Sequence, residues 1–394
     1  LRRPQRMQRL QLLLPLVVFL ACWQTVESHR AKRGAPDPNV LLWDKTVPIP
    51  YIIDSEYSDE EKETIRATLK TFEENTCLNY REDYDSPGFK LEFWLEPNND
   101  ASCKADVGRI ESRNTKLYLP HSCIDKFQIQ HETMHTLGFR HTQTRPDRDN
   151  YVIVDERAQE DDAYKKVEST PDYGIPYEYT SAMHYGSGVY GSEYMKPIDE
   201  DYEKTFGGSR MIFNDWKLIN LHYKCNEMCP TQINCQNGGY QHPRLCTECV
   251  CPQFYNGTNC EFEKDAVILT PGVIEKMDSE FEHNLALQVD TSYESYQRTS
   301  ARIIKAPEGT RIRVTIVDIL NGEGRCPPQC DYKAVQIVDG DLTSVGKRFC
   351  CHRYREDAEL PYSFVSKSNV VGWVVFARAG LDLVTNVTFA VEGY

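Results

Sequence analysis

The chain has 394 residues, enough for two or three folding units at roughly 150 residues each. It carries 45 lysines and arginines against 59 aspartates and glutamates, so its formal net charge is -14. Because nucleic acids and anionic membranes attract basic surfaces, this balance argues against both as partners. After the N-terminus no apolar run approaches the roughly 20 residues that span a bilayer, so we expect no membrane span.

The N-terminus has the pattern of a secretory signal peptide. Arg9 precedes an apolar run over residues 10–21, and Ser28 offers signal peptidase a small residue. We predict a signal peptide over 1–28, with Met7 as a plausible initiator, and a short basic processing segment over 29–33. A core helix is the alternative. A secreted, extracellular location permits disulfides, and removal of Cys22 leaves fourteen of the 15 cysteines, an even number.

Cysteine spacing divides the rest of the chain. Residues 34–225 hold four widely spaced cysteines, whereas six lie between Cys229 and Cys260. The remaining residues alternate between apolar and polar, as in strands. We predict an α+β domain over 34–225, a small disulfide-rich module over 226–261 and an all-β sandwich over 262–394.

Local signals place elements in these domains. Ser58 and Glu61 have the spacing of a capping box, and apolar residues then recur at helical spacing, which predicts a helix. Residues 89–96 alternate in hydrophobicity and end at Pro97, as expected of a half-buried strand. Residues 311–316 and 369–377 also read as strands of the last domain.

The strongest motif is the run HETMHTLGFRH over residues 131–141. On a helix His131 and His135 lie one turn apart on one face and can bind one ion. Glu132 lies about 100° round the helix from His131, beside that ion. Gly138 can end the helix in the left-handed conformation, so that the chain turns back and His141 arrives as a third ligand.

This donor set indicates zinc chemistry. Three neutral imidazoles suit one Zn²⁺ ion and leave a position for water, whose pKa the ion lowers to roughly 7. Glu132 can then take the proton of that water as general base. The alternative is a helix with surface histidines and no metal.

A second motif follows some forty residues later, where the chain reads YTSAMHY over 179–185. Metzincins place a tight methionine turn at this distance, beneath the zinc. Met183 is then an apolar floor under the histidines, although a methionine in such a run is otherwise a core residue.

The longer run HETMHTLGFRHTQTRPDRDNY closely resembles the signature of the astacin family of zinc endopeptidases, and SAMHY is similar to that family's turn. The resemblance implies a two-subdomain metzincin catalytic domain. It also implies that Tyr185 is a further zinc ligand, which swings away during catalysis to stabilise the oxyanion. Four charged residues match the family too and are interpreted as a buried ion network: Arg145, Asp147, Arg148 and Asp149.

The resemblance extends to the substrate cleft and departs at one position. Residues 107–109 resemble the strand that lines the family's cleft, where an extended peptide can add to the sheet edge. The family pairing implies the disulfides Cys103–Cys123 and Cys77–Cys225. Thr142 stands where the family usually has a glutamate that holds the mature N-terminus, so that anchor is either lost or replaced by another group.

The cysteine-rich segment resembles an EGF-like module, with the implied pairs Cys229–Cys246, Cys235–Cys249 and Cys251–Cys260; a zinc knuckle is the competing interpretation. The remainder resembles a CUB domain more weakly. Its neighbouring cysteines, Cys350 and Cys351, are expected to pair with Cys326 and Cys330 in an order left open, because a bond between neighbours strains the peptide. Asn256 and Asn386 head glycosylation sequons.

These patterns predict a secreted zinc metalloendopeptidase, resembling nematode-type astacins, that hydrolyses protein or peptide substrates. Its EGF-like and CUB-like modules would position it on extracellular matrix. The alternative is a binding protein of the matrix whose protease fold is catalytically idle.

Overall fold

The computed structural model describes residues 36–96, 102–171, 173–186, 194–281, 297–320, 329–353, 359–378 and 383–393. The predicted signal peptide and basic processing segment lie outside these residues. No helix among the described residues has both the length and the apolar character needed to cross a bilayer.

The first domain begins with a five-stranded sheet in the order β2-β1-β3-β5-β4. Four strands run parallel and β4 pairs antiparallel at the edge. The strands are β1 (Ile49–Ile53), β2 (Tyr80–Glu82), β3 (Leu91–Trp94), β4 (Lys104–Ala105) and β5 (Thr115–Tyr118). The strand expected over 89–96 is β3, and it buries Leu91 and Phe93 while the alternate residues are half-exposed.

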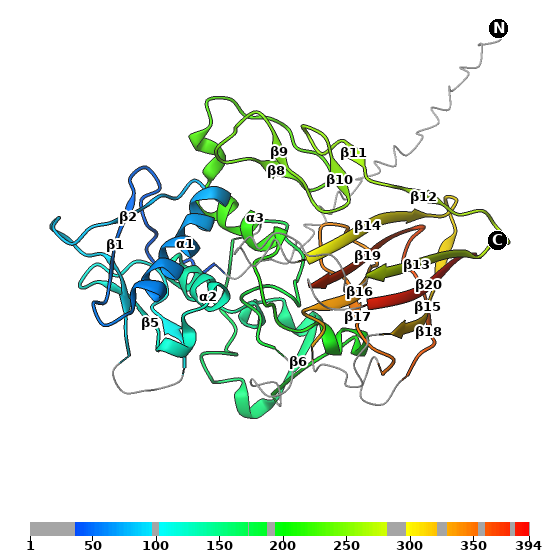
Figure 1. Ribbon diagram of the computed structural model, residues 1–394, viewed down its shortest axis with the longest axis horizontal. Helices are drawn as coiled ribbons and strands as arrows, with labels where there is room; N and C mark the ends of the chain where they lie inside the picture. Colours follow the sequence, from blue (N-terminus) through cyan, green and yellow to red (C-terminus); the bar gives the residue numbers. More distant parts are fainter. Residues whose placement is uncertain are drawn as a thin grey trace, which may run out of the picture. The chain divides into compact units, whose positions relative to one another are not determined.

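Two helices pack side by side in this half of the domain (Figure 1). Helix α1 (Asp59–Asn75) begins at Ser58, whose capping box with Glu61 is present as the sequence predicts. Helix α2 (Lys126–Thr136) begins at Asp125, whose carboxylate accepts two backbone N–H groups of the first turn. The N-terminus of α2 is therefore fixed a short distance before the histidines that it carries.

The described residues of the second half of this domain are mostly irregular, with one two-stranded sheet of β6 (Val152–Val154) and β7 (Met195–Pro197) and one helix, α3 (Phe213–His222). Its described short 3-10 turns are η1 (His121–Cys123), η2 (Thr142–Thr144), η3 (Arg148–Asn150), η4 (Glu156–Ala158), η6 (Glu200–Thr205) and η7 (Cys225–Met228). A tyrosine-rich cluster that includes Tyr177 and Phe206 forms its core. The disulfide Cys77–Cys225 joins the end of α1 to the end of this half.

The charged residues that follow the third histidine are largely buried. The Arg145 guanidinium makes two hydrogen bonds of 2.8 Å to the carboxylate of Asp147, and both side chains are at most 4 % exposed. Arg148 is also buried, and it pairs with the more exposed Asp149. A buried pair with this geometry satisfies its charges and fixes the turn after His141.

The disulfide-rich segment has two short hairpins, β8 (Tyr240–Gln241) with β9 (Cys249–Val250) and β10 (Tyr255–Asn256) with β11 (Phe262–Glu263). Its three disulfides join Cys229 to Cys246, Cys235 to Cys249 and Cys251 to Cys260. All six cysteines are bonded, so none is available to ligate the zinc of a knuckle.

The last domain is a sandwich of two sheets, in the orders β12-β14-β19-β16-β17 and β13-β20-β15-β18. Their inner faces share one apolar core, in which Ile316, Trp373 and Phe389 are buried. The strands are β12 (Val267–Ile268), β13 (Glu275–Phe281), β14 (Gln297–Lys305), β15 (Arg311–Leu320), β16 (Lys333–Val338), β17 (Lys347–Phe349), β18 (Tyr362–Val365), β19 (Val370–Arg378) and β20 (Leu383–Glu392). The strands expected over 311–316 and 369–377 are β15 and β19.

Cysteine pairing in the sandwich is described for one bond, Cys330–Cys350. Cys351 is disulfide-bonded as well, and Cys326 lies outside the described residues. Asn256 is exposed on β10. Asn386 is half-buried within β20, between its neighbours β13 and β15, and its amide oxygen is buried. Of the two predicted glycan sites, Asn256 is therefore the more accessible.

Candidate metal centre and active-site cleft

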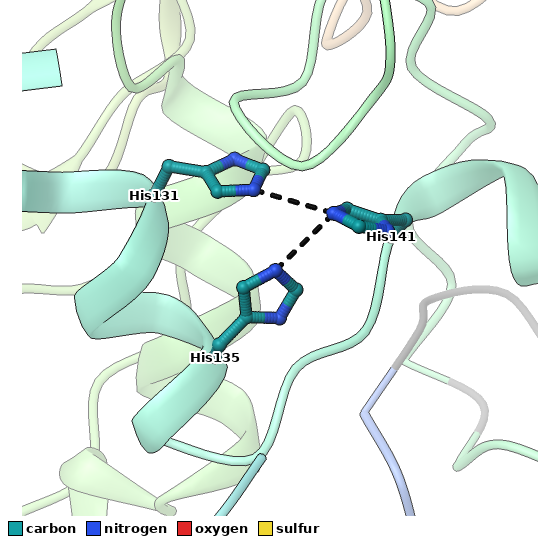
Figure 2. Close-up of side chains that lie close together, drawn as sticks. All are labelled: His131, His135 and His141. Carbon is teal, nitrogen blue, oxygen red and sulfur yellow. Dashed lines mark hydrogen bonds between the residues drawn. The ribbon is translucent and has the colours of Figure 1, made fainter. Parts of the chain in front are cut away.

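Three imidazoles converge on one point. Figure 2 shows His131 and His135 projecting from one helix, and His141 reaching toward them from the chain that follows it. The Nε2 atom of His141 lies 3.2 Å from Nε2 of His135 and 3.3 Å from Nε2 of His131. Gly138 makes this approach possible, because it adopts a φ of +98° after α2 ends and reverses the chain.

The hydrogen bonds behind two of these rings determine which nitrogen faces inward. Nδ1 of His131 lies 2.6 Å from the carbonyl oxygen of Ala182, and Nδ1 of His135 lies 2.7 Å from that of Phe139. Because a carbonyl only accepts, each Nδ1 carries the proton and each Nε2 presents a lone pair to the centre.

Converging lone pairs repel one another unless a cation binds between them. Burial lowers the pKa of all three imidazoles, and the neighbouring rings lower those of His135 and His141 further, so the rings are neutral at physiological pH. A tetrahedral zinc site with Zn–N distances of roughly 2.0 Å has its nitrogens about 3.3 Å apart. The observed separations therefore fit zinc without rearrangement.

Glu132 lies beside this centre and makes no ion pair with any described residue. Its side chain is 2 % exposed, and one carboxylate oxygen is buried with no hydrogen-bond partner in the described part of the chain. Burial raises the pKa of Glu132 to about 8. A divalent cation nearby favours the carboxylate and lowers this value, so that the group is poised to accept and release a proton near neutral pH.

The methionine turn contacts the histidine segment through its backbone. Met183 is 2 % exposed, and its carbonyl oxygen accepts the N–H of Thr142 over 2.7 Å, which ties the turn to the residue after His141. Ala182 in the same turn supplies the carbonyl that orients His131. The turn therefore positions two of the three imidazoles through backbone contacts.

Asp215 of α3 holds this turn in place, a role that the sequence analysis missed. Its carboxylate accepts the hydroxyl of Ser181 over 2.6 Å and the N–H of Ala182 over 2.9 Å. It also accepts the N–H of Ile212 at the start of its own helix, over 3.1 Å. An aspartate at the third position of a helix is a local capping signal, but its contact to a turn more than thirty residues away is not visible in the sequence.

Tyr185 follows the methionine turn and lines a cleft that the three histidines also line. Its ring centroid lies 4.3 Å from that of His141, and its N–H donates to the side-chain oxygen of Gln143 over 3.2 Å. Burial raises the pKa of the phenol to about 12, so it is protonated and can donate a hydrogen bond at neutral pH.

The histidines open into a cleft of about 770 Å³. Residues around β4 line one part of it, including Lys104 and Ala105, and Val107 also contributes. The prediction of a strand over 107–109 was wrong in position: the edge strand is Lys104–Ala105. Gly108 and Arg109 instead donate their N–H groups to the backbone of His135 and Leu41. The disulfide Cys103–Cys123 ties β4 to the turn that precedes α2.

Thr142 lines a separate small cavity of about 20 Å³. Two buried carboxyls, Glu178 and Asp215, line it as well. Acidic groups are thus present near the position where the family usually has its glutamate, but they come from other segments of the chain.

A histidine triad completed by a glycine-reversed chain, with a glutamate beside it and a methionine turn below, defines a metzincin-type zinc metallopeptidase domain. Residues 37–224 match the family model for astacin, a family of peptidases. This segment is an astacin-family domain, as its motif predicts, and its metal is zinc.

The chain is similar to several known proteins. Zinc metalloproteinase nas-36 of Caenorhabditis elegans is 29% identical over 379 residues, covering 93% of this chain and 58% of that protein. Zinc metalloproteinase dpy-31 of the same organism is 36% identical over 244 residues, 59% of this chain and 40% of that protein. The chain thus spans about half the length of these relatives. Among solved structures, the medaka hatching enzyme zinc-protease HCE-1 is 29% identical and covers 46% of this chain and 94% of its own, with a TM-score of 0.40.

Proposed function

We propose that the chain is a secreted zinc metalloendopeptidase that hydrolyses peptide bonds of extracellular or matrix proteins. The observation that carries this proposal is the convergence of three imidazole lone pairs beside Glu132, at an open cleft. His131, His135 and His141 would hold the zinc, with Tyr185 as a further ligand. When bound, the ion supplies Lewis-acid chemistry, polarising a carbonyl and acidifying water.

The chain's own residues supply the proton transfers. Glu132 accepts a proton from the attacking water, since its buried oxygen has no competing partner among the described residues. It then delivers that proton to the departing amine nitrogen, so that the peptide is split into a carboxylate and an amine. When Tyr185 swings away from the metal, its phenol is protonated and donates a hydrogen bond to the negative oxygen that develops on the scissile carbonyl.

The edge strand β4 orients the substrate. Among the described strands it pairs with β5 alone, and both of its residues, Lys104 and Ala105, line the cleft. An extended peptide adding to this edge would place its main chain across the metal. Recognition through main-chain hydrogen bonds favours unfolded or extended segments of protein substrates.

Secretion and matrix binding extend this proposal. The described residues contain six disulfides with both partners placed, a density typical of oxidising compartments. The EGF-like module over 226–261 and the CUB-like domain over 262–394 would hold the enzyme near matrix proteins. The domain bounds, the signal peptide and the glycans at Asn256 and Asn386 belong to this same proposal.

Casein hydrolysis by the purified chain tests the proposal. Wild type should cleave casein and contain one zinc per chain, and a zinc chelator should abolish cleavage. Glu132→Ala should lose about a hundredfold or more in kcat while it retains zinc. Glu111→Ala is the matched control, because Glu111 is exposed and pairs with Arg109 at the surface. If wild type binds zinc but does not cleave, the chain is the catalytically idle binding protein.

A further inference from the structure

The CUB-like domain contributes directly to the catalytic cleft. Two of its residues, Gln329 and Tyr332, line the same 770 Å³ cleft as the three histidines, Glu132 and Tyr185. They precede β16, more than a hundred residues after the last residue of the astacin-family match. The cleft therefore has a wall that does not belong to the protease fold.

Gln329 lies against the residue that follows Tyr185. A Cβ atom built on Gly186 would come within 2.2 Å of the side-chain nitrogen of Gln329, and one built on Gly207 within 2.8 Å of the Gly186 Cα. At Gly207 the neighbouring atom belongs to the backbone, so only glycine permits the approach there, whereas a side chain at Gly186 would displace the end of the Gln329 side chain. The Gln329 amide is consequently next to the backbone that carries Tyr185.

The segment between these two residues is held rigidly. The N–H of Cys330 donates to the carbonyl of Lys204 in the catalytic domain over 3.0 Å, and its sulfur is bonded to Cys350. Asp331 pairs with the buried guanidinium of Arg348 over 3.2 Å. Cys330 is thus held by a disulfide and by a hydrogen bond across the domain boundary, and Asp331 is held by an ion pair within its own domain. These two residues fix their neighbours, Gln329 and Tyr332, at the cleft.

We propose that Gln329 and Tyr332 are substrate-contacting residues that help determine which polypeptides the enzyme cleaves. This inference rests on the proposed function. A glutamine amide both donates and accepts, which matches the main chain of an extended peptide. The Tyr332 side chain is large and 45 % exposed, so it offers a ring face to an apolar or aromatic side chain of the substrate.

The chemistry of this wall specifies the class of ligand. A polypeptide long enough to reach from the metal to the CUB-like domain gains both contacts, whereas a very short peptide gains neither. The CUB-like domain therefore selects for chain length and for an apolar residue at some distance from the scissile bond.

The test compares the full chain with Gln329→Ala/Tyr332→Ala. The probe is a ten-residue quenched fluorescent peptide, taken from a casein site that the wild type cleaves. We expect the double variant to raise KM about tenfold while kcat stays within about twofold, since the contacts are remote from the reacting atoms. In the Glu132→Ala background, the Kd for the same peptide should rise by the same factor.

Controls separate this effect from misfolding. Ile268→Ala, an exposed apolar residue of β12 in the same domain, should change neither constant. Zinc content and melting temperature should match the wild type in all variants. An unchanged KM would overturn the proposal. So would a loss of kcat alone, because the residues would then act through Tyr185. A wild type that cleaves no casein would instead refute the proposed function, and this inference with it.

Discussion

Lys347 should be the main electrostatic link between the catalytic and CUB-like domains. Its ammonium lies 2.7 Å from the carboxylate of Asp201 and 3.0 Å from that of Asp199. The side chains of Lys347 and Asp201 are only 10 % and 7 % exposed, whereas Asp199 is 42 % exposed. Tyr362 donates its hydroxyl to Asp201 as well.

The burial of Lys347 and Asp201 determines how much free energy of unfolding their ion pair contributes. Burial alone disfavours the ammonium, but the hydrogen bond and charges of the two aspartates outweigh it and raise the pKa of Lys347. A lysine with a raised folded-state pKa contributes fully below pH 10.5, so the link is intact at neutral pH. Lys347→Met leaves Asp201 buried without its cation, which costs about 3 kcal/mol, while Asp199 adds at most about 1 kcal/mol.

Amide hydrogen exchange measures this loss of stability at the boundary between the two domains. The amides of Val345 and Arg348 donate across the boundary to Glu178 and Thr205. In Lys347→Met they should exchange on the order of 100-fold faster, the equivalent of about 3 kcal/mol. The amide of Val314, in the sandwich core, should keep its rate.

Two further variants decide the interpretation. Lys305→Met removes a pair with Glu263 whose partners are about one third exposed, so its effect should be small. Adding Asp201→Asn to Lys347→Met removes the stranded charge and should restore at least half of the lost protection. If Lys347→Met exchanges at the wild-type rate, or if Lys305→Met accelerates exchange equally, the buried pair does not hold the domains together.

Three other perturbations probe the catalytic domain. Tyr185→Phe should lower kcat for casein about tenfold or more with KM little changed, because the donor to the developing oxyanion is lost while the three histidines still hold the ion; an unchanged kcat contradicts that role. Burial raises the pKa of Glu178 to about 8, so the folded state retains a proton that the unfolded chain releases above pH 4.5. Its stabilising contribution is complete below pH 4.5 and is lost as the pH rises through about 8, by up to about 1.4 kcal/mol per unit. Glu178→Gln should flatten this slope in denaturant unfolding at about pH 5, 6.5 and 8, and an equal slope in both proteins argues against it. Replacing both Cys103 and Cys123 by serine opens a loop with a sequence separation of 20, which costs about 3 kcal/mol. It also releases β4, so KM for casein should rise at constant zinc content. An unchanged KM together with an unchanged free energy of unfolding would show that the sheet alone fixes the edge.

The metal centre was predictable because its information is local. The one-turn spacing of His131 and His135, and the glycine that reverses the chain before His141, are determined by helix geometry and by the conformational freedom of Gly138. The capping box at Ser58 is local in the same sense and is present as predicted. Each feature spans fewer than a dozen residues.

The supports of the centre were not predictable from these patterns. Asp215 reaches Ala182 across 33 residues, and nothing in the spacing of the two segments indicates the contact. The edge strand was placed three residues too late, because a strand of only two residues, Lys104–Ala105, has too little alternation to be recognised. Its position depends on pairing with β5 and on the disulfide beside it.

Strand β17 shows how the domain boundary is encoded. It lies at the edge of its sheet, yet all three of its residues are buried, including Lys347 and Arg348. An isolated edge strand would expose such cations and leave its unpaired N–H groups to water. Here the catalytic domain covers the edge: Asp201 binds Lys347, and Thr205 accepts the N–H of Arg348.

The same surface of the catalytic domain leads back to the active site. Asp201 and Thr205 belong to η6, and the chain continues from η6 to Gly207, which lies against Gly186 next to Tyr185. Separation of the two domains would therefore expose two buried cations and remove the wall of the cleft in one step. For this reason we expect the CUB-like domain to be part of the active-site structure.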